Sequence, residues 1–287
     1  MPGRLAQAII RRLTVAGSDA GLDGLGPVAG GDMKSALIIQ MRVIGALILR
    51  ETRSRFGRSQ LGYLWAIAEP LSYVILLSLI ISSIGRHPPF GNDSALFFAT
   101  GILPYFLFSH LVKSVGGAFD SNEALLTYPI VKPIDTLFAR GVLEIATSAL
   151  VMIVMFTGLM IVNHVPGPEN MHVIAVAMLG LALLGFGVGS VNAVVGRLFS
   201  SWRQIYDTFS RGLMLVSAVF FPLDSLPTGL RDAVAMIPIA HGVELFRTGY
   251  YASYRSTALD PGYLLAAGLL LSLMGLAAER VVRMRSA

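Results

Sequence analysis

One stretch decides the fold of this chain: RETRSRFGRSQLGYLWAIAEP, residues 50–70. Its first part carries four arginines in nine residues, which cannot enter hydrocarbon without a large energetic cost. It leads into an apolar run, Ala66 to Ile84, that is long enough to cross a bilayer. Tyr63 and Trp65 lie between the two parts, where amphipathic rings concentrate at membrane interfaces. The stretch therefore marks a membrane surface, and its arginines indicate the cytoplasmic side.

The composition of the whole chain is that of a membrane protein. Of its 287 residues 54% are hydrophobic and 14% charged, whereas soluble domains are about 25% charged. The net charge of +5 does not indicate nucleic-acid binding, because the basic residues flank apolar runs instead of forming a groove with interleaved aromatic residues. The chain has no cysteine, which excludes disulfides, thiolate metal sites and cysteine catalysis.

Hydropathy predicts an all-α polytopic membrane protein with six transmembrane helices. The spans are expected near Trp65–Ile84, Ala95–Gly117, Thr136–Val162, Val173–Val195, Ile205–Pro222 and Gly262–Val282. Arginine and lysine gather before the first span, after the second and fourth spans, and in the tail, while the other loops hold few or balanced charges. The positive-inside rule then places both termini in the cytoplasm.

Three segments are expected along the chain. Residues 1–37 are predicted to be a flexible cytosolic tail, because they bury too little apolar surface to order themselves. Residues 38–60 are predicted to form an amphipathic helix in the cytoplasmic interface, since Ile39, Val43 and Leu47 recur at helical spacing. A seventh span is the alternative there, and Arg42 argues against it. Residues 61–287 form the six-span domain.

The outer side contains a further segment, Leu223 to Tyr254, which is apolar but interrupted by Pro227 and Pro238. It is too broken to span the membrane. Short re-entrant or interfacial helices between spans five and six are expected, because backbone at that depth must find its hydrogen bonds within the protein.

The sequence lacks recognisable catalytic motifs. It contains no phosphate-binding G-x-x-x-x-G-K-[ST] loop, no H-E-x-x-H zinc motif and no G-x-S-x-G elbow, and its histidines lack metal-ligand spacing. The charges within spans are therefore the candidates for function. Arg140 and Glu144 fit either an ion pair along one helix or a functional pair. Lys113 either snorkels to lipid headgroups or contacts substrate, and Glu69 needs a partner or water.

The loop SNEALLTYPIVKPIDT, residues 121–136, is the other landmark. A short helix stopped by Pro129 and Pro133 would make a stiff element facing the cytosol, suited to receive force from a partner protein. An ordinary connection between two helices is the alternative.

Several motifs resemble one protein family. Residues 50–57 and 61–70 are similar to the start of the membrane subunit of ABC-2-type polysaccharide exporters. YPIVKPIDT, residues 128–136, resembles the matching loop of the capsular polysaccharide export branch. FPLDSLP, residues 221–227, and PIAHGVELFR, residues 238–247, resemble the outer-face segment of that family. The resemblance covers the chain from about residue 38 to its end, and the N-terminal tail departs from it.

The resemblance implies a permease subunit that moves a lipid-anchored acidic polysaccharide across the bacterial inner membrane. It implies a homodimer with two separate ATP-binding subunits, so that ATP and magnesium are bound by the partner and this chain needs no cofactor of its own. A periplasmic adaptor and an outer-membrane export channel are further implied partners.

The resemblance also suggests roles for residues. Residues 50–60 would be a gating helix at the cytoplasmic mouth. Candidates for contact with substrate or lipid headgroups are Arg50, Arg53, Arg55, Arg58, Tyr63, Trp65, Glu69 and Lys113. Candidates for coupling to the ATPase are Asn122, Glu123, Leu125, Leu126, Tyr128, Pro129, Lys132 and Pro133. Candidates in the periplasmic segment are Asp224, Pro227, His241, Glu244 and Arg247. Arginine forks suit phosphate and carboxylate groups, but the same arginines can serve topology and lipid contact alone.

Two other functions stay open. A membrane enzyme acting on lipid-linked sugars would need a catalytic acid or nucleophile in a polar cavity, and Asp224, Asp232 and Glu244 are scattered candidates. An ion-coupled transporter would need acids that cycle protons within the membrane, for which Glu69 and Glu144 are the candidates.

Overall fold

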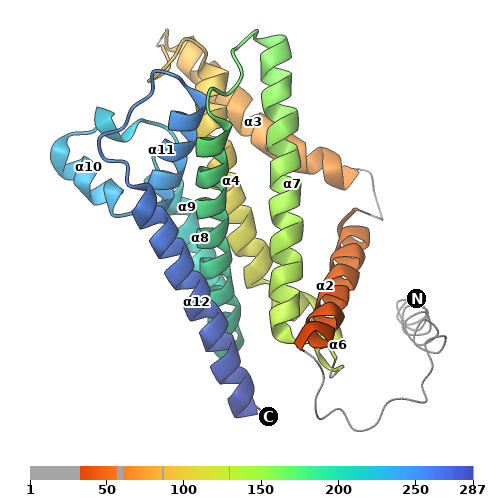
Figure 1. Ribbon diagram of the computed structural model, residues 1–287. Helices are drawn as coiled ribbons and strands as arrows, with labels where there is room; N and C mark the ends of the chain where they lie inside the picture. The colour runs from red at the N-terminus through yellow and green to blue at the C-terminus, as the bar shows by residue number, and fades with distance from the viewer. Residues whose placement is uncertain (1–32, 57–60, 86, 129, 287) are drawn as a thin grey trace, which may run out of the picture. The chain divides into compact units, whose positions relative to one another are not determined.

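The structure is a computed structural model in which residues 33–56, 61–85, 87–128 and 130–286 are described (Figure 1). These residues form helices and turns, with no strand among them. The chain divides into two compact units, Met1–Arg42 and Val43–Ala287. Helix α2 (Met33–Phe56) begins five residues before the predicted start at residue 38, and the rest of the predicted tail lies outside the described residues.

Five helices in the described part of the chain are long and apolar enough to cross a membrane. They are α3 (Leu61–Ser83), α4 (Ser94–Gly116), α7 (Pro133–Val162), α8 (Met171–Leu198) and α12 (Pro261–Ser286). Each coincides with one of the predicted spans. Long uninterrupted apolar runs are the signal that hydropathy detects reliably, and that signal accounts for these five helices.

The span predicted at Ile205–Pro222 does not appear as one helix. Helix α9 (Trp202–Leu213) has 12 residues, which rise about 18 Å, well short of the about 30 Å of a hydrocarbon core. Turns follow it, and Ala218 has a positive φ of 57°, a conformation that cannot continue a right-handed helix. Hydropathy averaged over residues 205–222 could not detect this interruption, because the apolar residues in the window outweigh its charged residues in the mean.

Helix α8 is the centre of the bundle and packs against α4, α11 and α12. Figure 1 shows α4, α8 and α12 running alongside one another. Small residues allow the close approach. A Cβ added at Gly187 would lie 2.5 Å from the Ser272 nitrogen, and one at Gly275 would lie 2.5 Å from the Ser190 Cβ. Close backbone contact through small residues is a common way to join helices in membranes.

The core lies around α4, and other helices leave apolar surface exposed. Phe97, Ile102 and Leu107 of α4 are fully buried. The apolar windows of α3 and α7 are only 11% and 17% buried. Extended apolar surface of this kind is covered by lipid or by another protein.

The segment predicted to lie on the outer side contains a short 3₁₀ turn (Leu223–Ser225), α10 (Thr228–Ala235) and α11 (Pro238–Tyr250). Pro227 caps the start of α10 and Pro238 occupies the first turn of α11. Proline is favoured at helix starts, where its missing N–H costs nothing. The two prolines that interrupt the apolar run therefore begin its two helices, and membrane re-entry by these helices stays a prediction.

Candidate functional site

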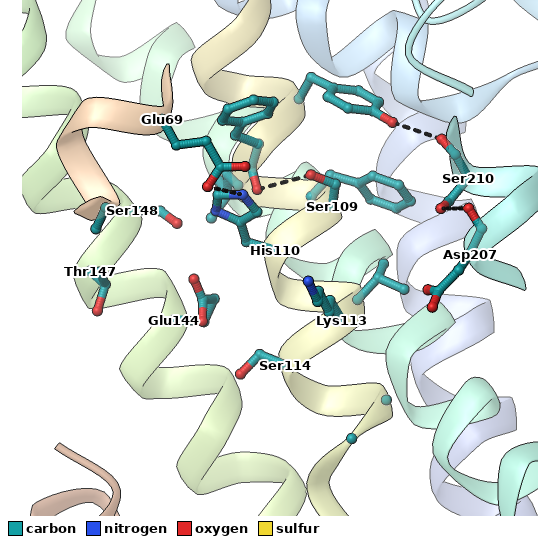
Figure 2. A pocket seen from close by; sticks show the side chains of 18 of the residues that line it. Glu69, Ser109, His110, Lys113, Ser114, Glu144, Thr147, Ser148, Asp207 and Ser210 are labelled. Atoms are coloured by element: carbon teal, nitrogen blue, oxygen red, sulfur yellow. Dashed lines mark hydrogen bonds and ion pairs between the residues drawn. The ribbon is translucent and has the colours of Figure 1, made fainter. Parts of the chain in front are cut away.

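A cavity of about 970 Å³ lies among α3, α4, α7, α8 and α9. Figure 2 shows Glu69 of α3, His110 and Lys113 of α4, Glu144 of α7 and Asp207 of α9 around this space. Ionisable side chains within membrane segments are costly unless they face water or pair with one another. The cavity thus gathers ionisable side chains of α3, α4, α7 and α9 around one space.

Three of the predicted substrate candidates, Trp65, Glu69 and Lys113, line the cavity. Glu69 also has a partner, because its Oε2 lies 3.7 Å from the Nε2 of His110. Its side chain keeps 41% of its surface exposed, so the contact leaves it open to the cavity. His110 is therefore a partner for Glu69, and contact of Glu69 with water or substrate stays a prediction.

Only part of the predicted cationic segment, residues 50–58, lies among the residues that the structure describes. The guanidinium of Arg50 donates to the Asn122 Oδ1 and lies 3.6 Å from the Glu51 carboxylate. Arg53 is exposed on α2. Arg58 lies outside the described residues, as do the side chains of Arg55 and Tyr63. Arg50 is thus occupied by contacts within the protein, and substrate contact by the others stays a prediction.

An ion pair that sequence reasoning did not include joins α2 to α7. The Nη2 and Nε of Arg140 donate to Glu51 Oε1 at 2.7 and 3.0 Å, and its Nη1 donates to the Ser114 carbonyl at 2.9 Å. Glu51 is only 9% exposed. The two residues are 89 positions apart, so no local spacing could have indicated this contact. Arg140 is therefore a link between helices in addition to any role along α7.

The predicted coupling loop folds into two single turns, α5 (Ala118–Ser121) and α6 (Glu123–Leu126). Asn122, between them, is buried and donates to the Ala118 carbonyl at 2.8 Å while accepting from Arg50. Glu123, Tyr128 and Lys132 are exposed, whereas Leu125 and Leu126 are half-buried. Pro129 lies outside the described residues. The exposed residues of this loop are the ones available to a partner.

Pro133 does not end the short helix but begins α7. It occupies the first turn of α7, and the Lys132 N–H donates to the Asp135 carboxylate at 3.0 Å in a capping arrangement. Its fixed φ suits that position. The proline therefore joins the loop directly to a long membrane helix.

The predicted periplasmic candidates are held inside the protein. Glu244 and Arg247 of α11 are fully buried and 3.6 Å apart. Arg247 donates to the carbonyls of Ala218 and Val219, each at 2.6 Å, and its guanidinium lies 4.4 Å from the centre of the Phe97 ring. We call this group the outer cluster; it comprises Glu244, Arg247, Tyr254 and the backbone of residues 218–223. It binds the turns after α9 to α4 and α11.

Glu244 completes the outer cluster as an acceptor. Its carboxylate accepts from the Leu223 N–H at 3.2 Å and from the Tyr254 hydroxyl at 2.9 Å. Burial, together with the neighbouring Glu244 carboxylate, raises the pKa of Tyr254. Burial likewise raises the pKa of Tyr251 to about 12. Protonated tyrosines are thus part of the folded arrangement on this side.

His241 and Asp224 also have structural partners. His241 Nδ1 accepts from the Asp260 N–H at 3.0 Å, and its Nε2 lies 2.7 Å from the Ala235 carbonyl, which can only accept. Asp224 accepts from the N–H and the hydroxyl of Thr257, both at 2.8 Å. Two of the three acids considered for an enzyme, Asp224 and Glu244, are therefore engaged in holding loops together, whereas Asp232 is exposed and, among the described residues, pairs only with the neighbouring Arg231.

Ser109 is the cavity hydroxyl that is adjacent to His110 in the sequence, and the two side chains are not paired. A nucleophilic mechanism needs a hydroxyl hydrogen-bonded to its base. Ser109, the hydroxyl next to His110 in sequence, donates instead to the Phe106 carbonyl at 3.4 Å. Within the described ranges no group of three or more His, Cys, Asp and Glu residues is placed to hold a metal ion.

Comparison with known proteins identifies a family and several relatives of this chain. Residues 42–251 match the family model for the ABC-2 type transporter. The chain is 34% identical over 242 residues to the capsule polysaccharide export inner-membrane protein CtrC of Neisseria meningitidis serogroup A, covering 84% of this chain and 91% of the relative. It is 32% identical over 251 residues to the polysialic acid transport protein KpsM of Escherichia coli, covering 86% and 96%.

A third relative extends this pattern. The capsule polysaccharide export inner-membrane protein BexB of Haemophilus influenzae is 29% identical over 243 residues, covering 85% of this chain and 92% of the relative. The family match and the relatives all include the helices that surround the cavity. This chain therefore belongs to the ABC-2 type transporter family.

Proposed function

We propose that this chain is the permease subunit of an ATP-driven exporter that moves an acidic capsular polysaccharide on a lipid anchor across the bacterial inner membrane. The observation that carries the proposal is the similarity to capsule polysaccharide export proteins over 84% of the chain. The charged cavity among apolar helices supports it, since a polar polymer needs a polar path through hydrocarbon.

The proposal places α9 and the turns after it within the membrane. If both termini are cytoplasmic, the number of crossings is even, and the five long helices need a sixth segment between α8 and α12. Backbone that is not helical is tolerated at membrane depth where it lines a cavity or is buried in protein. Helix α9 lines the cavity and the outer cluster satisfies the carbonyls of residues 218, 219 and 221, which supports a broken fifth crossing there.

The proposal also assigns ATP hydrolysis to a partner. The chain has no phosphate-binding loop motif, and the exposed residues Glu123, Tyr128 and Lys132 supply a surface for two ATP-binding subunits. Arg50 connects the same loop to α2 through Asn122, so a push on the loop would reach the cytoplasmic interface helix. The exposed apolar surfaces of α3 and α7 are suited to a second copy of the chain. A periplasmic adaptor and an outer-membrane channel complete the proposed assembly.

The test is export in an encapsulated bacterium whose own capsule permease has been deleted. We expect that this chain, supplied with its partner ATPase, restores polysaccharide to the cell surface, and that the purified chain alone hydrolyses no ATP. Surface polysaccharide that fails to appear although both proteins are in the membrane would contradict the proposal. A sugar-transfer product made by the chain alone would favour the enzyme instead.

A further inference from the structure

Helix α9 has two chemically different sides. Arg203, Asp207 and Arg211 follow one another at four-residue intervals and all line the cavity. Such spacing puts side chains on the same side of a helix. Ile205 and Phe209 are 59% and 66% exposed, and neither lines the cavity. The polar side of α9 is thus a wall of the cavity.

Most charges around the cavity are matched by opposite charges. Arg140 pairs with Glu51, Arg203 pairs with Asp120, and His110 lies near Glu69. Lys113 of α4 and Arg211 of α9 differ. Among the described residues, neither Lys113 nor Arg211 forms a hydrogen bond or a close ion pair, although the charge of Lys113 acts on the Glu69 carboxylate, and both side chains are exposed. Two cations in a membrane cavity are thereby available to an external anion.

The remaining lining indicates the kind of anion. Asp207 and Glu144 share the cavity with the two cations, as Figure 2 shows for Lys113, Asp207 and Glu144. Acids repel a doubly charged phosphate more strongly than a singly charged carboxylate, and the exposed Asp207 can accept hydrogen bonds from sugar hydroxyls. Lysine and arginine bind single carboxylates through charge-assisted hydrogen bonds. A polymer that carries both hydroxyls and carboxylates therefore fits this lining better than a phosphate headgroup does.

We propose that Lys113 and Arg211 each bind a carboxylate of the glycan inside the cavity, and that the two cations together select acidic glycans. This proposal rests on the proposed function, which supplies the acidic polysaccharide as the ligand. It adds the residues that recognise the negative charge of that ligand. Arg211 lies eight residues beyond Arg203, about 12 Å further along α9. Arg211 is therefore about two helical turns away from the Arg203–Asp120 pair.

The chain carries its own reporter for this site. It has two tryptophans, Trp65 and Trp202, and both line the cavity. Tryptophan fluorescence of the full chain in phosphatidylcholine nanodiscs would follow a titration with a short oligomer of sialic acid. The same oligomer with its carboxylates reduced to alcohols is the matched neutral probe.

We expect the acidic oligomer to change the fluorescence with a saturable dependence. Lys113→Gln and Arg211→Gln should each weaken its apparent affinity about tenfold, the loss expected for one charge-assisted hydrogen bond. Asp207→Asn should strengthen it, because a repulsive charge is removed. Arg255→Gln removes one exposed positive charge in the outer loop and should change nothing. Lys113→Arg and Arg211→Lys should restore most of the affinity.

Several outcomes would overturn the site. They are a wild-type chain that does not respond to the acidic oligomer, variants whose titrations superimpose on the wild type, and equal losses for the acidic and neutral oligomers. Competition by dodecyl phosphate at equal concentration would assign the site to a phosphate headgroup instead. Unchanged thermal unfolding of the variants excludes misfolding as the cause. If the wild type restores export in cells but the variants bind the oligomer normally, the site is wrong while the proposed function stands. If the wild type fails to restore export although it binds the acidic oligomer and the variants do not, the proposed function is wrong while the site stands.

Discussion

This apolar bundle holds charged residues in two regions, the outer cluster and the cavity. The two regions differ in how far their charged side chains are exposed and in the contacts that these side chains make. In the outer cluster, Glu244 and Arg247 have no exposed surface and are bound to each other, to tyrosine and to backbone carbonyls. In the cavity, Glu69 is 41% exposed, and Lys113 is also exposed and forms no hydrogen bond among the described residues. A buried charge with every contact made inside the protein serves the fold, whereas a charge left open to a cavity is available to a ligand.

The largest expected effect comes from breaking the outer cluster. Arg247→Met should destabilise the protein by about 3–5 kcal/mol, because it leaves the Glu244 carboxylate buried without its cation. Thermal unfolding of the detergent-purified protein measures this. Glu244→Gln combined with Arg247→Met should recover part of the loss. A single variant as stable as the wild type would show that the cluster is not structural.

The ion pair of Glu51 and Arg140 is intermediate in exposure between the outer cluster and the cavity, since both side chains are about one-tenth exposed. Glu51→Gln should cost about 2 kcal/mol, the value of hydrogen bonds to a charged group. Export should fall further than stability if α2 transmits movement of the coupling loop. Exchanging the charges, Glu51→Arg with Arg140→Glu, is the control that should restore both. Export that follows stability alone would make the pair purely structural.

The buried tyrosines of the outer side provide a test by pH. Burial raises the pKa of Tyr251 to about 12, above the value of about 10 for an unfolded chain. The folded state therefore favours the protonated ring, and this stabilisation is complete below about pH 10 and is lost as the pH rises toward 12. Alkaline unfolding followed by tyrosinate absorbance should shift to lower pH in the wild type relative to Tyr251→Phe. Coincident curves would contradict this.

The smallest effect on stability is expected in the cavity. Glu69→Gln removes a contact with His110 between two side chains that are 41% and 32% exposed, and such pairs contribute less than about 1 kcal/mol. Unfolding should therefore be nearly unchanged while export by the complete transporter is reduced. A stability loss as large as that of Arg247→Met would remove the distinction between the two regions.

The same contrast explains what could be predicted from the sequence. Five spans were predictable because each is one long apolar run. Trp65, Glu69 and Lys113, which line the cavity, could be named as candidates because charged and aromatic residues are conspicuous in such runs. The interruption after α9 could not be seen by averaging hydropathy over residues 205–222. The partnership of Glu51 with Arg140 depends on helices brought together by the tertiary fold. Glu244 and Arg247 were noted as charges of a loop, but their burial depends on the carbonyls of residues 218 and 219.

The glycines between α8 and α12 have a mechanical consequence. Gly187 and Gly275 each face a neighbour that leaves no room for a methyl group, so α8 and α12 are in close contact along this line. Helix α8 also lines the cavity, through Asn192 and Gly196. We therefore expect an enlargement of the path during a transport cycle to come from movement of α3, α7 or α9 and not from separation of α8 and α12.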